Sequence, residues 1–172
     1  MFDIKFFQKA TPYKDQIVAG NFLKSDADEI ERELDTFRIR EPKVFNIETT
    51  NYCNMKCIMC PRTELMTRKN IWIEDKTFLK VIEQIKPHSS QDLEKFWDFI
   101  ERTYGLTGDE RSENTFYFRV VSRCVILHGY GEPLLDKKIA ERVKVCSEKG
   151  IPTYFSCVPA NLTLERAKEV MD

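Results

Sequence analysis

The strongest strand pattern in the sequence lies in the stretch Cys124-Val-Ile-Leu-His-Gly-Tyr-Gly-Glu-Pro133. Its first four residues form a continuous apolar run, which is typical of a strand buried on both faces of a parallel sheet. A loop with two glycines follows at once, and residues 136–149 then repeat apolar side chains at helical spacing. The stretch therefore predicts a strand, a loop and a helix in succession, which is the repeating unit of α/β folds.

Two further strand and helix pairs are predicted on either side of this stretch. Residues 44–47 are typical of a short strand, and residues 75–86 of a helix that Pro87 ends. Residues 153–158 predict a third strand, and residues 164–171 a final helix. This alternation predicts parallel strands with right-handed crossovers. The carboxyl ends of such strands meet at one edge of the sheet, where binding sites form.

The other segments carry weaker patterns. Residues 1–24 are predicted to be irregular, because a proline and a glycine punctuate them. Residues 25–38 and 89–104 carry apolar stripes that predict helices. Residues 116–121 are predicted to be a strand or an extended segment.

Length and composition indicate one globular domain. The chain has 172 residues, of which 42% are hydrophobic and 32% charged, so collagen-like and largely disordered classes are excluded. We expect an N-terminal helical extension over residues 1–42. The core is expected over residues 43–172, with an insertion around residues 88–120.

Charge and terminal sequence bear on partners and location. The net charge of −1 argues against a nucleic-acid footprint spread over the whole surface. Residues 1–5 mix charges with apolar residues and do not resemble a secretory signal. No apolar run reaches the 18 residues of a membrane span. We therefore expect a cytoplasmic protein without a membrane partner, in which the six cysteines stay reduced.

Three of the cysteines, Cys53, Cys57 and Cys60, lie within eight residues, directly after the first predicted strand. Three thiolates so close together can surround one metal centre. A structural zinc site needs a fourth ligand, for which His128 is a candidate. An iron–sulfur cluster is also well served by thiolates, and three ligands would leave one iron of a four-iron cluster open. The other cysteines, Cys124, Cys146 and Cys157, are scattered and are predicted to be small buried side chains.

The spacing Cys-x-x-x-Cys-x-x-Cys after a first strand resembles that of the radical S-adenosylmethionine (SAM) superfamily. The Glu-Thr-Thr-Asn lead-in at residues 48–51 and the trailing Cys-Pro-Arg resemble one branch of it. The resemblance implies a [4Fe–4S] cluster on Cys53, Cys57 and Cys60, whose open iron binds SAM. It also implies reductive cleavage of SAM to a 5′-deoxyadenosyl radical, which abstracts hydrogen from a substrate.

The resemblance extends to the glycine-rich loop. Tyr130, Gly131 and Glu132 match the Gly-Gly-Glu triplet of the family, with tyrosine in place of its first glycine. This match implies that the loop binds the amino group of SAM, through backbone carbonyls and the acidic side chain. Met59 stands where the family often has an aromatic residue against the adenine, so the resemblance implies that Met59 contacts SAM. No catalytic residue is assigned beyond the cluster.

Several neighbouring residues have two interpretations. His128 either faces the site or is held by hydrogen bonds within the fold. The basic residues around the cluster either offset its charge or form a solvated face; they are Lys56, Arg62, Arg68 and Lys69. Ser156 and Asn161 lie at the end of the third predicted strand and are candidates for contact with SAM or substrate.

The resemblance covers residues 43–172 and implies the N-terminal half of a partial (β/α)6 TIM-like barrel, apparently truncated, because three βα units are found where the family has about six. The implied partners are an electron donor such as flavodoxin or ferredoxin, an unknown substrate and a second chain completing the barrel. Two alternatives stay open. One is a non-catalytic fragment or split-enzyme subunit that keeps the cluster motif, and the other is a structural zinc protein.

Overall fold

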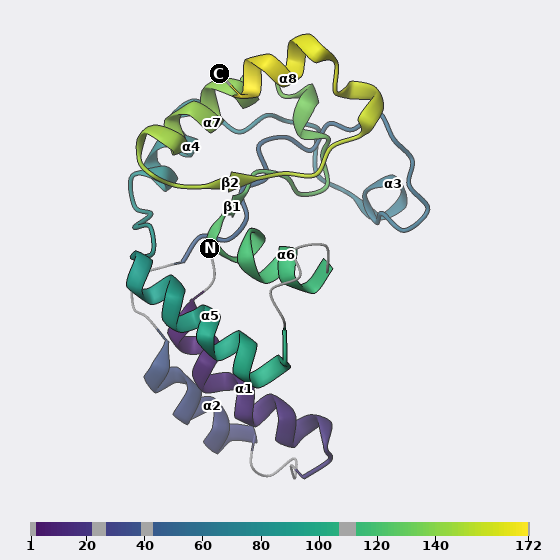
Figure 1. The fold of residues 1–172 in the computed structure, drawn as a ribbon. Coiled ribbons are helices and arrows are strands. Elements are labelled where there is room, and N and C mark those ends of the chain that lie inside the picture. The colour runs from purple at the N-terminus through teal and green to yellow at the C-terminus, as the bar shows by residue number, and fades with distance from the viewer. Residues whose placement is uncertain (1–2, 22–26, 39–42, 107–112, 172) are drawn as a thin grey trace. The chain divides into compact units, whose positions relative to one another are not determined.

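The computed structural model (Figure 1) forms two compact units. The strand unit consists of Val44–Pro87 and Cys124–Asp172. The helical unit consists of Phe2–Lys43 and His88–Arg123. The residues that the structure describes are 3–21, 27–38, 43–106 and 113–171.

The strand unit is built around two short parallel strands, β1 (Val125–Ile126) and β2 (Thr153–Tyr154). Leu127 N donates to Tyr154 O at 2.8 Å, which extends the pairing by one bond. Residues 45–47 lie along the other side of β1, also in the parallel direction. Three extended segments therefore point their carboxyl ends the same way.

Four helices lie in the described part of the strand unit. They are α3 (Arg62–Leu65), α4 (Asp75–Ile82), α7 (Ile139–Glu148) and α8 (Leu164–Met171), with single 3-10 turns at Pro133–Leu135 and Pro159–Asn161. Two of them, α4 and α7, contribute buried side chains to the core of the unit. Ile82 and Ile139 are fully buried against Val125 and Leu127. Cys146 is buried in the same cluster, and this burial raises the pKa of its thiol to about 11.

The helical unit contains α1 (Ile4–Val18), α2 (Ala27–Phe37), α5 (Ser90–Tyr104) and α6 (Glu113–Arg119), followed by a 3-10 turn at Val121–Arg123. Ile4, Phe96 and Ile100 form its buried core. The Phe7 ring meets Phe96 edge-on, with centroids 5.8 Å apart. Ser89 caps α5 by accepting a hydrogen bond from Asp92 N (3.1 Å). The expected insertion around 88–120 thus lies in this unit, with the N-terminal helices.

The expected fold class is wrong. Helices make up 56% of the structure, and the described residues form only two short parallel strands, so the fold is mostly helical and not half of a partial TIM-like barrel of parallel βα units. The four-residue apolar run at 124–127 pairs with its neighbours over only a few residues, and β1 is two residues long. An apolar run shows that a segment is buried, but the length of a strand depends on its partners.

Two local predictions are also wrong. Residues 4–18, predicted to be irregular, form α1 with Pro12 inside the helix. Asp3 begins this helix, because its carboxylate accepts a hydrogen bond from Phe6 N (3.1 Å). Residues 116–119, predicted to be extended, belong to α6. Their aromatic composition favours strands, but here Phe116 and Arg119 line a pocket with α5.

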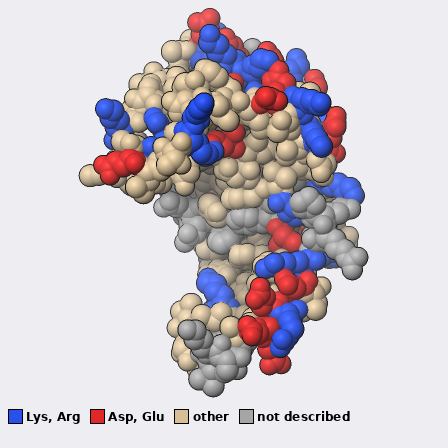
Figure 2. Space-filling view, turned by 180° about the vertical axis from the view of Figure 1, so that it is seen from behind, with Lys and Arg blue, Asp and Glu red and all other residues tan. Residues whose placement is uncertain are grey.

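The surface mixes both signs of charge. Figure 2 shows acidic and basic side chains interspersed on the face that it draws, in keeping with the net charge of −1. Among the described residues, no helix combines the length and the apolar character needed to cross a membrane. Cys124 and Cys146 are buried as predicted, whereas Cys157 is half-buried.

Candidate metal and cofactor site

The clustered cysteines lie on a loop whose base is closed by backbone pairing. Residues 49–51 run antiparallel to residues 71–73, and Ile73 N donates to Thr49 O at 2.8 Å. We call residues 52–70, which lie between these two segments, the cysteine loop. Because both ends of the loop leave from a paired base, its position on the strand unit is fixed there.

Asn51 holds the base together from inside. Its side chain is almost fully buried, at 1% exposure, and its Oδ1 accepts a hydrogen bond from Ile71 N at 2.7 Å. Its Nδ2 donates to Lys69 O at 2.9 Å. The rings of Tyr52 and Trp72 stack beside it, with centroids 4.0 Å apart. The sequence pattern places Asn51 in the Glu-Thr-Thr-Asn lead-in but does not predict this role.

The glycine loop, residues 129–132, lies directly on this base. A Cβ added at Gly131 would lie 1.9 Å from Thr50 O, so no side chain fits at this position. Glu132 N donates to Tyr52 O at 2.7 Å, one residue before Cys53. Glycine is thus required at position 131 by contact with the protein backbone at Thr50.

The carboxylate of Glu132 is buried and accepts hydrogen bonds from two backbone N–H groups of the strand unit. The residue is 3% exposed, and its Oε1 accepts a hydrogen bond from Leu134 N at 3.1 Å. Its Oε2 accepts from Val158 N at 2.8 Å. Glu132 thus links the loop after β1 to the segment after β2, and its burial is balanced by these backbone donors.

Glu48 is a second carboxylate at this edge that the sequence analysis did not single out. Its Oε2 accepts a hydrogen bond from Tyr130 N at 2.7 Å, and its Oε1 pairs with the Arg68 guanidinium at 2.8 Å. A Cβ at Gly129 would lie 2.4 Å from Glu48 Oε2. Glu48 therefore joins the glycine loop to the cysteine loop, and its place in the Glu-Thr-Thr-Asn lead-in was the available signal.

The cysteines lie in the first half of the cysteine loop, Cys53 beside the base and Cys57 and Cys60 further out. All three are free thiols, with Cys57 exposed and Cys53 and Cys60 half-buried. A turn joins two of them, because Cys60 N donates to Cys57 O at 3.0 Å. In the described part of the chain, no group of three His, Cys, Asp or Glu residues is positioned to hold a metal ion. The donor set fits an iron–sulfur cluster in chemistry and access, and the thiols would have to converge to bind it.

Met59 and Tyr130 have their side chains open to solvent. Met59 is 89% exposed and lines a hollow of about 450 Å³ formed by the cysteine loop. Tyr130 is 48% exposed and lines a smaller hollow of about 220 Å³ together with Pro61 and Arg68. Both side chains are available to a ligand at this edge, in contrast to Gly131 and Glu132, which serve the packing of the loops.

The basic residues of the cysteine loop mostly brace it. Arg62 Nη2 donates to Cys53 O at 2.6 Å, which ties α3 to the start of the cysteine motif. Arg68 pairs with Glu48. Lys56 lines the larger hollow beside Cys57. Lys69 takes part through its backbone carbonyl, which accepts from Asn51.

The residues after β1 and β2 are bonded to one another. His128 Nδ1 accepts a hydrogen bond from Ser156 N at 3.1 Å, and burial lowers the pKa of the imidazole. The structure thus favours the interpretation of His128 as a residue held within the fold. The side-chain amides of Asn161 and Asn54 exchange hydrogen bonds of 2.9 and 3.1 Å, so Asn161 contacts the cysteine loop.

The two motifs singled out in the sequence therefore lie together at one edge of the strand unit. Glu132 contacts Tyr52 beside Cys53, and Tyr130 faces Pro61 beside Cys60. No protein-family model, curated protein or solved structure matches the chain in comparisons with known proteins. The function is consequently inferred from these residues and their geometry.

Proposed function

We propose that the cysteine loop holds a [4Fe–4S] cluster through Cys53, Cys57 and Cys60, and that the protein is a radical SAM enzyme. The observation that carries this proposal is the hydrogen bond from Glu132 N to Tyr52 O (2.7 Å), because it joins the glycine loop to the residue before Cys53. Two motifs that lie about 70 positions apart in the chain are thereby brought to the same edge.

The chemistry of the cysteine loop supports the choice of cluster. Its three thiols are soft sulfur donors, all free, and Cys57 is exposed to incoming iron and sulfide. A backbone N–H, that of Met55, already lies 3.4 Å from Cys53 Sγ, and N–H donors of this kind tune sulfur ligands. When bound, the cluster with SAM would supply one-electron cleavage of the sulfonium.

The chain's own residues divide into two roles in this proposal. Met59 and Tyr130, both exposed, would contact the nucleotide part of SAM, since a thioether and an aromatic ring each pack on a purine. Gly131 and Glu132 would shape the glycine loop, whose backbone carbonyls are acceptors suited to an ammonium group. Glu132 is a positioning residue here, because its carboxylate already accepts two backbone hydrogen bonds.

Anaerobic reconstitution with iron and sulfide tests the cluster. We expect about four irons per chain, and a loss of most of that iron in Cys57→Ala. Cys157→Ala is the matched control, because burial and the nearby Glu132 carboxylate raise the pKa of that thiol and disfavour the ligating thiolate. An iron content that stays near zero, or that falls equally in both variants, would contradict the proposal. Zinc in protein purified without oxygen would support the structural zinc alternative.

Incubation of the reconstituted protein with SAM and a strong reductant tests the activity. We expect 5′-deoxyadenosine, detected by chromatography, and none from Cys57→Ala. The mostly helical fold with two short strands favours one competing function, a cluster-bearing subunit or fragment without activity. Iron binding without 5′-deoxyadenosine would support that function instead.

The proposal also defines partners and location. An electron donor such as flavodoxin or ferredoxin would reduce the cluster, and the substrate is unidentified. A reducing, cytoplasmic environment suits the cysteine loop, because its three cysteines must remain thiols until the cluster is inserted.

A further inference from the structure

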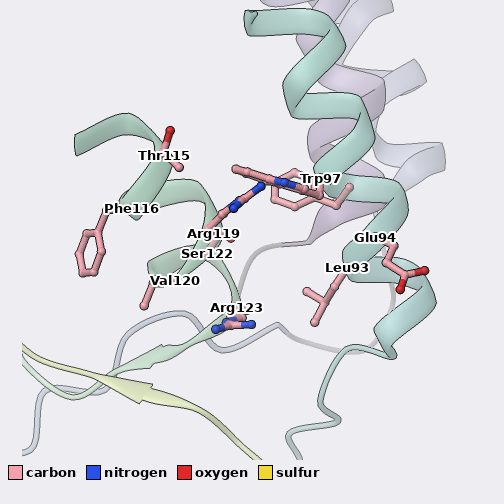
Figure 3. Close-up of a pocket in the computed structure, with 10 residues that line it drawn as sticks. Leu93, Glu94, Trp97, Thr115, Phe116, Arg119, Val120, Ser122 and Arg123 are labelled. Atoms are coloured by element: carbon pink, nitrogen blue, oxygen red, sulfur yellow. The ribbon is translucent and has the colours of Figure 1, made fainter. Parts of the chain in front are cut away.

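The helical unit contains a pocket that the proposed function does not use. It has a volume of about 500 Å³ and lies between α5, α6 and the turn that follows α6 (Figure 3). Pockets for small molecules commonly measure roughly 300–1,000 Å³. All of its lining residues belong to the helical unit, so the pocket is complete within one compact part of the chain.

The walls of this pocket are largely apolar and aromatic. Leu93, Phe96 and Trp97 come from α5, whereas Phe116 lines the edge of the pocket from α6 and its ring points away from Trp97 (Figure 3). Phe96 is 2% exposed and belongs to the buried core of the unit, which gives this wall a rigid base. Aromatic walls of this kind favour a ligand with a flat apolar body.

Positive charge is concentrated at the same pocket. Arg119 and Arg123 line it from the α6 side, and the Arg119 guanidinium lies 4.3 Å from the centre of the Trp97 ring. Glu94 is the acidic residue of the lining, and Figure 3 shows its carboxylate pointing away from both guanidinium groups. The pocket therefore combines apolar walls with two cationic donors, which suits an anionic group on the ligand.

Trp97 adds an unsatisfied donor to this wall. Its indole Nε1 is buried and has no hydrogen-bond acceptor among the described residues. Arg119 also pairs with Glu101 at 3.6 Å, but a guanidinium has five N–H donors and can serve a second acceptor as well. An acidic group bound beside Arg119 would bring oxygen acceptors within reach of that guanidinium.

We propose that this pocket binds an aromatic carboxylate. The ring lies against Leu93 and Trp97 of α5, and the carboxylate pairs with Arg119 and Arg123. The proposal is independent of the cysteine loop, because no residue of that loop lines the pocket.

Calorimetric titration of the full chain with 2-naphthoate, and separately with the uncharged 2-naphthamide, tests this proposal. The two probes share a ring system and differ in charge. We expect 2-naphthoate to bind at least about tenfold more tightly, since hydrogen bonds to charged groups are the stronger ones. Absence of 2-naphthoate binding at millimolar concentration, or equal affinities for the two probes, would overturn the proposal.

Two arginine variants locate the binding. Arg123→Gln should weaken 2-naphthoate binding about tenfold and leave 2-naphthamide binding unchanged, because only the charged probe loses a partner. Arg102→Gln is the matched control: it removes an arginine from α5 that does not line the pocket. Circular dichroism would verify that both variants fold. An unchanged affinity in Arg123→Gln, or an equal loss in Arg102→Gln, would place the probe elsewhere and overturn the proposal.

Discussion

The base and the tip of the cysteine loop differ in almost every physical respect. At the base, Asn51 is 1% exposed, and its side chain makes two hydrogen bonds to the backbone of the opposite arm, at Lys69 and Ile71. At the tip, Ile58 and Met59 are almost fully exposed, and Cys57 is exposed as well. A rigid base with an open tip keeps the cysteines at one place while leaving their sulfurs able to converge on a ligand.

The largest loss of stability is expected when the contact between the glycine loop and the base of the cysteine loop is disturbed. In Gly131→Ala the new methyl group would meet Thr50 O at 1.9 Å, so the two backbones must separate. We expect a loss of about 3 kcal/mol in the free energy of unfolding, measured by urea denaturation.

Gly150→Ala is the control for this variant. Gly150 has a φ of +67° and open space around it, so alanine there meets backbone strain alone and should cost about 1 kcal/mol. Equal losses in the two variants would show that the contact between Gly131 and Thr50 does not stabilise the fold.

A paired substitution compares base and tip directly. Asn51→Ala removes a buried side chain and both of its hydrogen bonds to the opposite arm, with Ile71 N and Lys69 O, so we expect a loss of about 2 kcal/mol. Asn54→Ala removes an exposed amide pair with Asn161 at the tip and should change stability by less than about 0.5 kcal/mol. Urea denaturation of both variants is the measurement, and similar losses would contradict the distinction between base and tip.

The smallest expected effect concerns pH and the bond between His128 and Ser156. Burial lowers the pKa of His128 below its ordinary value of 6.5, so the unfolded chain takes up a proton first as the pH falls. The stabilising contribution of neutral His128 to the free energy of unfolding is therefore complete above pH 6.5. It is lost as the pH drops through that value and below.

His128→Gln keeps an acceptor for Ser156 N and cannot titrate. We expect the free energy of unfolding of this variant to fall less between pH 8 and pH 5.5 than that of the unchanged protein. At pH 8 the histidine is neutral, so the difference in the free energy of unfolding between the two proteins there measures only the altered hydrogen bond to Ser156 N. Parallel curves over the whole range would refute the role of His128.

The sequence predicted helices correctly where a capping or helix-ending residue bordered apolar residues at helical spacing. The helix expected at 89–104 is α5, Ser90–Tyr104, because Ser89 caps it and Gly105, with a φ of +62°, ends it. The helix expected at 164–171 is α8. Helix α1 was missed because Pro12 suggested a break; the side chains of Ile4 and Phe7 pack in the core of the helical unit and hold the helix in place.

The fold class and parts of the site depended on contacts between distant segments, which local patterns do not contain. Gly131 was expected to serve SAM, but it packs on Thr50 O, which lies 81 residues earlier in the chain. The Glu132 carboxylate was likewise expected to bind the amino group of SAM, whereas in the structure it accepts hydrogen bonds from two backbone N–H groups. The roles of Cys53, Cys57 and Cys60 stay predictions.

The closed base has a consequence for chain cleavage. A single protease cut between Ile58 and Met59, both exposed, would leave fragments still joined through Ile73 N to Thr49 O and through the Asn51 side chain. The nicked protein should therefore run as one species under native conditions and as two in denaturant. For the same reason, a foreign peptide inserted between Ile58 and Met59 should leave the paired base of the cysteine loop intact.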